Sequence, residues 1–335
     1  MTYENFLLLQ RLKSDPLVYA QKLNPADDTV LLVELSSEQL ESHSFLDDRI
    51  FHPDMAFEWV PWGDFESGVS QLATSAPSYI FHIGHCGSTL LSRLIAEATD
   101  TRALREPLPL RLFAANQVES VIDWLDEGET SRRLSLFEKA WARGEAATTV
   151  KATSMCTNLL NFVDSDAGIV FIYQPAETHL AVILAGENAM QDLAGFGRNR
   201  HMRLAAMTDD LPPLEGMSVG ELAAMTWLAE VSTASQALRK REGFRLDFDD
   251  FLQRPGEMLA SSCEALGFET DRERCEAAVG GPIMRTYSKA PEHSYGPKLR
   301  DDIIADSKRR NAEEIAKGMQ LIERLRSTTC GADWH

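Results

Sequence analysis

Basic residues are scarce in this sequence. Across 335 residues, 33 Lys and Arg stand against 51 Asp and Glu, for a formal net charge of −18. Binding to nucleic acid or to an acidic membrane surface is driven by clustered Lys and Arg, so this balance argues against both as partners. Any anionic ligand must therefore be held by a local arrangement of donors.

The chain also has little cysteine and no long apolar run. Its five cysteines are odd in number and show no paired short spacing, so they predict neither a disulfide framework nor a zinc site. No apolar run approaches the ~20 residues that span a bilayer. Residues 1–10 carry Glu4 and no basic cluster, which argues against a cleaved signal peptide. We therefore expect a cytoplasmic protein that binds no metal.

The negative charge is concentrated at the start of the chain. Residues 1–75 hold thirteen acidic and four basic side chains, a net charge of −9. We read this part as an acidic N-terminal extension, followed by one domain over residues 76–335. Within the extension, the pattern predicts a helix over Glu4–Leu23, a strand over Thr29–Leu35 and an aromatic loop over Phe45–Phe65.

From residue 78 onward, short apolar strands alternate with helical stretches, which is typical of an α/β fold with a mostly parallel sheet covered by helices on both faces. The expected strands are Tyr79–Ile83, Ala147–Val150, Ile169–Tyr173 and Phe244–Phe248. The expected helices are Ser88–Ala98, Leu110–Leu125, Ser131–Ala142, Cys156–Phe162, Glu177–Leu184, Ser218–Lys240, Pro255–Leu266 and Asp302–Arg326.

Polar clusters follow three of these strands, at His85–Thr89, Lys151–Ser154 and Gln174–Glu177. Ligands of open parallel sheets collect beyond the carboxyl ends of the strands. We therefore expect the three clusters to meet in one crevice.

The first cluster follows the strand Tyr79–Ile83 and reads as an anion-binding turn. Gly84 and Gly87 permit backbone angles that a side chain would disfavour, and Cys86 lies between them. Ser88 and Thr89 then begin a helix whose unpaired N–H groups point into the turn. The turn suits a phosphate or a sulfate, although a plain strand-to-helix turn is the alternative.

A nucleoside triphosphatase loop would carry a lysine directly after its second glycine, where this chain has Ser88. Without that charge, and without a clear acidic strand end to hold magnesium, a kinase or ATPase reaction is disfavoured.

The loop resembles instead the 5′-phosphosulfate loop of sulfotransferases. Further landmarks follow in the order of the bacterial sulfotransferase-like family: Arg105-Glu106-Pro107, Lys151-Ala152-Thr153-Ser154, and Asp249-Asp250-Phe251-Leu252. The resemblance spans residues 78–300. It implies a three-layer P-loop fold and PAPS (3′-phosphoadenylyl sulfate) as the donor substrate, with a small molecule or a sugar as the acceptor.

The resemblance also implies roles for three catalytic candidates. Glu106 matches the general base, and partial burial is expected to raise its pKa toward the working pH. Lys151 would neutralise charge on the leaving phosphate. His85 stands where the family has Lys or Arg. A salt-bridged Glu106, a surface Lys151 and a turn histidine at position 85 are the structural alternatives.

The donor-binding candidates lie in the loop and near the C-terminus. They are Gly84, Cys86, Gly87, Ser88 and Thr89, together with Lys289 and Arg300 of the basic segment 285–300, which also contains His293 and reads as a loop. Family members grip the 3′-phosphate of the donor with an Arg and a Ser, where this chain has Tyr173 and Ala181. Substitutes could come from a further set, His179, Asn188, Arg198, Arg200 and Arg203.

Two functions from different classes follow. The first is a sulfotransferase-like enzyme that transfers a sulfuryl group from PAPS to a hydroxyl or an amine. The alternative is a non-catalytic or divergent P-loop protein, regulatory or kinase-like, that binds another nucleotide or anionic metabolite. The sequence indicates no oligomeric state.

Overall fold

The structure of the chain is a computed structural model, and it describes residues 7–72, 76–144, 146–287, 290–294 and 296–329. Its central element is a five-stranded parallel sheet in the order β5-β6-β4-β7-β8. The strands are β4 (Ser78–His82), β5 (Arg102–Arg105), β6 (Thr148–Lys151), β7 (Ile169–Tyr173) and β8 (Phe244–Asp247). Every residue of β4 and β6 is buried, as expected for strands covered on both faces.

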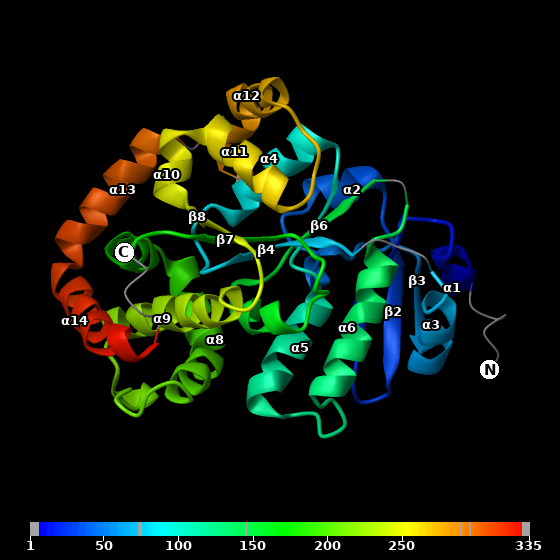
Figure 1. Cartoon of the computed structure of the whole chain (residues 1–335), viewed down its shortest axis with the longest axis horizontal. Helices are drawn as coiled ribbons and strands as arrows, with labels where there is room; N and C mark the ends of the chain where they lie inside the picture. The colour runs from blue at the N-terminus through cyan, green and yellow to red at the C-terminus, as the bar shows by residue number, and fades with distance from the viewer. Residues whose placement is uncertain (1–6, 73–75, 145, 288–289, 295, 330–335) are drawn as a thin grey trace.

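Helices form a layer on each side of this sheet (Figure 1). One layer contains α4 (Ser88–Thr99), α11 (Pro255–Ala265) and α12 (Arg272–Gly280). The other contains α5 (Leu108–Glu119), η3 (Ser154–Asn161) and α9 (Val219–Leu238), with α7 (Ala176–Ala185), α8 (Glu187–Ala205) and α14 (Ala312–Thr329) packed on α9. The predicted three-layer α/β fold with a parallel central sheet is confirmed. No helix in the described part of the chain combines the length and apolar character that crossing a bilayer requires.

The N-terminal part forms a second, antiparallel sheet beside the first. Its strands are β1 (Val18–Asn24), β2 (Thr29–Glu34) and β3 (Phe57–Pro61), and the segments around them are α1 (Leu7–Leu12), α2 (Ser37–Ser42), η2 (Asp48–Ile50) and α3 (Trp62–Val69). The side chain of Arg105 ties this part to the main sheet, because it donates to the carbonyl oxygens of Leu40, Glu41 and His43. The domain boundary after residue 75 stays a prediction.

Two predictions for this part are wrong. The expected helix Glu4–Leu23 is helical only at Leu7–Leu12 within the described residues, and β1 begins at Val18. Pro16 lies between the two elements, and proline has no N–H to continue a helix. The expected loop Phe45–Phe65 contains η2, β3 and the start of α3. Its strand forms by pairing with β2, a contact that local sequence does not reveal.

The main domain departs from prediction at several element boundaries. The predicted strands and the predicted Thr29–Leu35 strand are present, and β5 is an additional strand. The expected helix Leu110–Leu125 ends at Glu119, where Ser120 takes a left-handed conformation. The expected helix Asp302–Arg326 is divided at Asn311 into α13 (Pro297–Arg310) and α14. The expected loop 285–300 contains strands β9 (Thr286–Tyr287) and β10 (Ala290–Ser294).

The remaining elements complete the chain. They are α6 (Glu127–Trp141), η4 (Leu214–Gly216), α10 (Phe248–Gln253) and η5 (Pro282–Arg285). The expected helix Cys156–Phe162 is the 3₁₀ helix η3, and α8 and α12 are helices that the sequence pattern did not predict.

The buried carboxyl group of Glu138 makes the stability of this fold depend on pH. Glu138 of α6 accepts a hydrogen bond from the Tyr79 hydroxyl at 2.7 Å, and burial raises its pKa from 4.5 to about 7. A folded-state pKa above the unfolded value means that the fold disfavours the ionised form. The free energy of unfolding therefore falls as the pH rises from about 4.5 through about 7.

We expect Glu138→Gln to stabilise the protein at pH 8 by roughly 1–3 kcal/mol, at ~1.4 kcal/mol per pKa unit, and to change little at pH 4. Urea unfolding at a series of pH values measures this difference. The exposed Glu323 of α14 provides the matched control Glu323→Gln. An equal effect of Glu138→Gln at both pH values would show that its ionisation is not the cause.

Candidate active site

The turn between β4 and α4 has the backbone geometry that its glycines predict. Gly84, His85 and Gly87 all have positive φ angles, of 87°, 51° and 79°. At Gly87 the space matters as well as the angle, because a Cβ there would lie 2.1 Å from the Phe248 ring. The ring thus packs directly on the loop backbone, where only glycine leaves room.

This turn presents unpaired donors to the space above it. Among the described residues, the backbone N–H groups of Gly87, Ser88 and Thr89 meet no protein acceptor. The hydroxyl of Thr89 is buried as well, with the side chain only 3% exposed, and it has no hydrogen-bond partner within the described structure. A buried unpaired hydroxyl beside the N-terminus of a twelve-residue helix is a second feature that fits an anion.

A cavity of about 660 Å³ opens above the turn, along the carboxyl edge of the parallel sheet. It is lined by Phe45, Arg49, His82, Gly84, His85, Cys86, Gly87, Ser88, Thr89, Leu90, Glu106, Arg111, Lys151, Thr153, Ser154, Val182, Gln191, Asp192, Gly195, Phe196, Phe248, Leu252, Met284, Gly296 and Arg300. The structure therefore brings together all the predicted catalytic and loop residues, and Arg300.

The third predicted polar cluster does not share this cavity. Gln174 is fully buried, and its side-chain oxygen accepts a hydrogen bond of 3.4 Å from Arg300. The residues after it begin α7, with Pro175 as the N-cap. The expectation that all three clusters meet in one crevice is thus wrong for Gln174–Glu177.

Glu106 lies at the centre of a buried ionic cluster. Its carboxylate accepts from Lys151 Nζ at 2.5 Å and from Arg111 Nη2 at 3.0 Å. The side chains of Glu106 and Lys151 are 9% and 1% exposed. The backbone of Glu106 has a φ of 57°, and its N–H donates to the Lys151 carbonyl at 2.7 Å, which fixes the carboxylate beside the lysine.

The expected rise in the pKa of Glu106 does not occur. Burial by itself raises this pKa, but the nearby Lys151, followed by His82 and Arg111, outweighs burial and lowers it to about 2. The structural alternative of a salt-bridged Glu106 is what the structure shows, with Lys151 and Arg111 as the partners. The sequence indicated Lys151 as a site residue but not Arg111. Glu106 is therefore ionised at any physiological pH.

Several residues of the site were not predicted from the sequence. Arg111 of α5 donates from Nε to the Thr153 hydroxyl at 3.0 Å while holding Glu106. Phe45 and Arg49 come from the N-terminal part and form one wall, with the Arg49 guanidinium 3.9 Å from the Phe45 ring centroid. The only available signal for Arg111 was its place one turn into the helix after Pro107.

His82 braces the turn from below. Its Nδ1 accepts the N–H of Gly84 at 3.0 Å, and its Nε2 lies 2.9 Å from the carbonyl oxygen of Ala152. His82 thus links the turn to the backbone that follows Lys151. His82 ends a predicted strand, but its role was not predicted.

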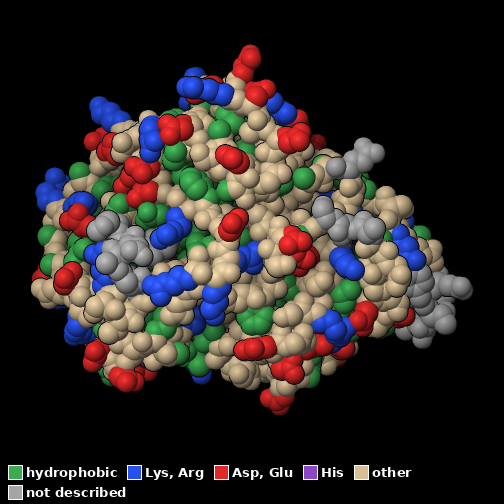
Figure 2. All heavy atoms as spheres, in the orientation of Figure 1, with side chains coloured by type: hydrophobic (Ala, Val, Ile, Leu, Met, Phe, Trp, Pro, Cys, Tyr) green, Lys and Arg blue, Asp and Glu red, His purple; other side chains and the backbone are tan. Residues whose placement is uncertain are grey.

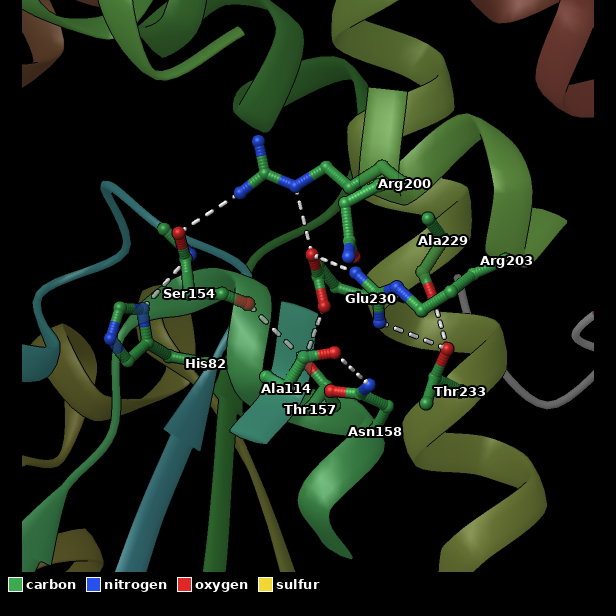
Figure 3. A network of polar contacts seen from close by, with 12 residues as sticks. His82, Ala114, Ser154, Thr157, Asn158, Arg200, Arg203, Ala229, Glu230 and Thr233 are labelled. Atoms are coloured by element: carbon green, nitrogen blue, oxygen red, sulfur yellow. Dashed lines mark hydrogen bonds and ion pairs between the residues drawn. The ribbon is translucent and has the colours of Figure 1, made fainter. Parts of the chain in front are cut away.

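Arg200 and Arg203 do not serve as substitute phosphate ligands, because they belong to a buried network (Figure 3). Arg200 contacts Glu230 at 2.8 Å, Asp192 at 3.0 Å and the Ser154 hydroxyl at 2.9 Å. Arg203 donates to Glu230 at 2.6 Å. This network supports the cavity wall through Ser154 and Asp192.

His179 and Arg198 do not line the cavity. His179 is fully buried, which lowers its pKa well below 6.5, and Arg198 is exposed on α8. Asn188 lies in α8, and its side chain is outside the described structure.

The expected 3′-phosphate positions lie outside the described lining of the cavity. Ala181 is buried beneath α13, and its carbonyl accepts from the Ser307 hydroxyl at 2.7 Å. Tyr173 packs on Phe171, with ring centroids 6.4 Å apart. Lys289 falls outside the described residues.

Arg300 is a basic residue of the C-terminal segment that lines the cavity. It is 7% exposed and donates to Asp249 at 2.6 Å. Its guanidinium lies 5.3 Å from the centroid of the Phe248 ring.

Comparisons with known proteins add a likeness of fold. No family model and no curated protein matches the chain. Solved structures that it resembles include the sulfotransferase domain from the curacin biosynthetic pathway, at 13% identity and a TM-score of 0.43, covering 76% of this chain and 99% of that domain. A sulfotransferase from Alicyclobacillus acidocaldarius is 15% identical in sequence, with a TM-score of 0.37, and the match covers 74% of this chain and 96% of that one.

Retinol dehydratase in a complex with retinol and PAP is a third such structure, at 12% identity and a TM-score of 0.35, covering 90% of this chain and 97% of that one. Likeness at this level supports no assignment of activity. The function of this chain has to be argued from its own site.

Removing the unpaired Thr89 hydroxyl should affect stability and anion binding in opposite directions. We expect Thr89→Val to leave stability unchanged or to raise it by about 1 kcal/mol, because it removes a buried unsatisfied group. The same change should weaken the binding of inorganic sulfate or pyrophosphate several-fold. Thermal unfolding and isothermal titration calorimetry measure the two effects.

Thr99 lies at the other end of α4, and its hydroxyl already donates to the Ile95 carbonyl, so Thr99→Val is the matched control. The control should leave anion binding unchanged. Unchanged anion binding in Thr89→Val would contradict a ligand role for this hydroxyl.

Proposed function

We propose that this chain is a sulfotransferase-like enzyme, which transfers a sulfuryl group from PAPS to a hydroxyl or an amine of a small molecule or a sugar. One observation carries the proposal: unpaired donors at the start of α4 face the same cavity as the buried carboxylate of Glu106. A tetrahedral anion and a proton acceptor are thereby brought to one place. The resemblance of the sequence motifs to sulfotransferases points the same way.

Each group has a role in this reaction. The N–H groups of Gly87, Ser88 and Thr89 hold the 5′-phosphosulfate, with the Thr89 hydroxyl as a further donor. Lys151 and His85 face charge that develops on the bridging oxygen. Glu106 accepts the proton of the acceptor hydroxyl.

The bond changes balance without a further reactant. The acceptor oxygen forms a bond to sulfur while the bond from sulfur to the 5′-phosphate oxygen breaks. The electron pair of the broken bond stays on that oxygen, which leaves as adenosine 3′,5′-bisphosphate. The acceptor proton ends on the carboxylate of Glu106.

The nucleotide end of the donor fits the other side of the turn. The strand order places Glu106 and Lys151 at β5 and β6, on one side of β4, and places Phe248 after β8 on the other. Phe248 and Arg300 together offer an aromatic face and a cation at that side. We propose that the adenosine 3′,5′-bisphosphate part extends there, with Arg300 near the 3′-phosphate.

A binding module is the second candidate, and the state of Glu106 favours it. A carboxylate held between two cations, with a pKa of about 2, is a weak base. In that case the turn binds an anionic metabolite without catalysis. A thermal-shift screen separates the two, because a non-adenosine anion would then stabilise the fold and adenosine 3′,5′-bisphosphate would not.

The first test is transfer of ³⁵S from labelled PAPS to a panel of hydroxyl and amine acceptors. We expect transfer by the wild type and a drop in kcat of roughly 10²–10⁴-fold in Glu106→Gln, the usual contribution of a general base. Glu323→Gln, on the exposed face of α14, serves as the control. Binding of adenosine 3′,5′-bisphosphate, measured in parallel with wild type and Thr89→Val, should weaken in the variant, which lacks the hydroxyl donor.

Two results would count against the proposal. If adenosine 3′,5′-bisphosphate does not bind at millimolar concentration, PAPS is not the donor. If Glu106→Gln keeps full activity, Glu106 is not the general base.

A further inference from the structure

Lys151 contacts Glu106 and also lines the cavity. Its ammonium group donates to Glu106, and the same side chain lines the cavity above the phosphate turn. It extends from the end of β6, next to β4 in the sheet, with Lys151 itself paired to Ile80 in the register. The side chain is 1% exposed, so any anion in the turn meets this charge with little screening by water.

The two cations on Glu106 differ in how firmly they are fixed. Arg111 is planar, and it also contacts the Thr153 hydroxyl and, at 3.5 Å, Asp47. Lys151 is a compact charge with three rotatable donors on a flexible stem. Of the two partners of Glu106, Lys151 is therefore the one whose charge can turn toward a ligand by rotation of its side chain. Its ammonium group lies 5.8 Å from the centroid of the Phe45 ring, which is itself part of the cavity wall.

The ion pairs of Glu106 with Lys151 and Arg111 make this carboxylate a weaker base. An ionised carboxylate that accepts from both Lys151 and Arg111 has little tendency to take another proton. An anion bound in the turn competes with Glu106 for the lysine. Loss of the lysine leaves Arg111 as the ion-pair partner of the carboxylate among the described residues, and it leaves the carboxylate beside a new negative charge. Both changes favour its protonated form.

We propose that the donor substrate itself activates Glu106, by drawing the ammonium group of Lys151 from the carboxylate to the phosphosulfate. This inference rests on the proposed function and adds a control to it. The base is weak while the donor site is empty and strong once the donor is bound. Proton transfer from the acceptor to Glu106 is therefore efficient only while the donor is bound.

The proposal has a reciprocal consequence that can be measured without catalysis. If Glu106 and the donor compete for one lysine, neutralising Glu106 must strengthen donor binding. We expect Glu106→Gln to bind PAPS, with no acceptor present, about 5-fold or more tightly than the wild type, the lower range of such couplings. A carboxyl that only supports the fold would weaken binding or leave it unchanged when replaced.

A second variant separates competition for Lys151 from simple removal of negative charge. In a Lys151→Met background, Glu106→Gln should no longer tighten PAPS binding. Asp47→Asn is the matched control, because Asp47 lies in the chain between the wall residues Phe45 and Arg49, and its ionic partners are Arg49 and Arg111. Its effect should be the same in both backgrounds.

Each outcome decides the proposal. Unchanged or weaker binding in Glu106→Gln overturns it, as does tightening that persists in the Lys151→Met background. If Lys151→Met alone does not fold, the Glu106→Gln/Lys151→Met double variant must bind more weakly than Glu106→Gln. Failure of the wild type to bind PAPS refutes the proposed function instead, so the two failures are distinguishable.

Discussion

The packing of the Phe248 ring on the backbone of Gly87 is the constraint on which the site depends. The ring occupies the place where any other residue would carry a Cβ, so the turn and the residues after β8 are fixed against each other. This contact holds the start of α4 with its N–H groups toward the cavity. It also places Arg300, which lies over the same ring, on the side of the turn that we propose for the nucleotide.

The order of the strands explains why the remaining groups converge. β4 is the central strand, and β6 and β5 follow on one side, so Lys151 and Glu106 emerge next to the turn at the same edge. The chain is strongly acidic as a whole, and on the face shown in Figure 2 acidic and basic side chains are interspersed. On the proposed function, the turn would therefore attract an anion through a few buried donors and cations, without a basic patch on this face.

The sequence predicted those parts of the site that depend on local pattern. Gly84 and Gly87 after a buried strand define the turn, and Glu106 and Lys151 directly follow or end strands that share an edge. The pKa of Glu106 could not be predicted in this way, since it depends on the positions of Arg111 and Lys151 in space. The burial of Arg200 could not be predicted either, because it depends on Glu230, thirty residues away on another helix.

The N-terminal part was the least predictable from sequence. Its strands form by pairing with one another across loops, and Phe45 and Arg49 reach the cavity from a segment about sixty residues away from Glu106 in the chain. No motif marks those residues, because their place is set by contacts such as that of Arg105 with the carbonyl groups after α2. The acidic extension thus contributes a wall to the candidate site.

The central claim is that the N–H groups of Gly87, Ser88 and Thr89 bind a tetrahedral anion. The most direct measurement follows the ¹H–¹⁵N signals of these three amides by NMR during titration with adenosine 3′,5′-bisphosphate. The account predicts saturable downfield shifts of all three amide protons, with one common dissociation constant. Signals that stay in place while the ligand binds elsewhere, or that do not respond at all, would contradict it.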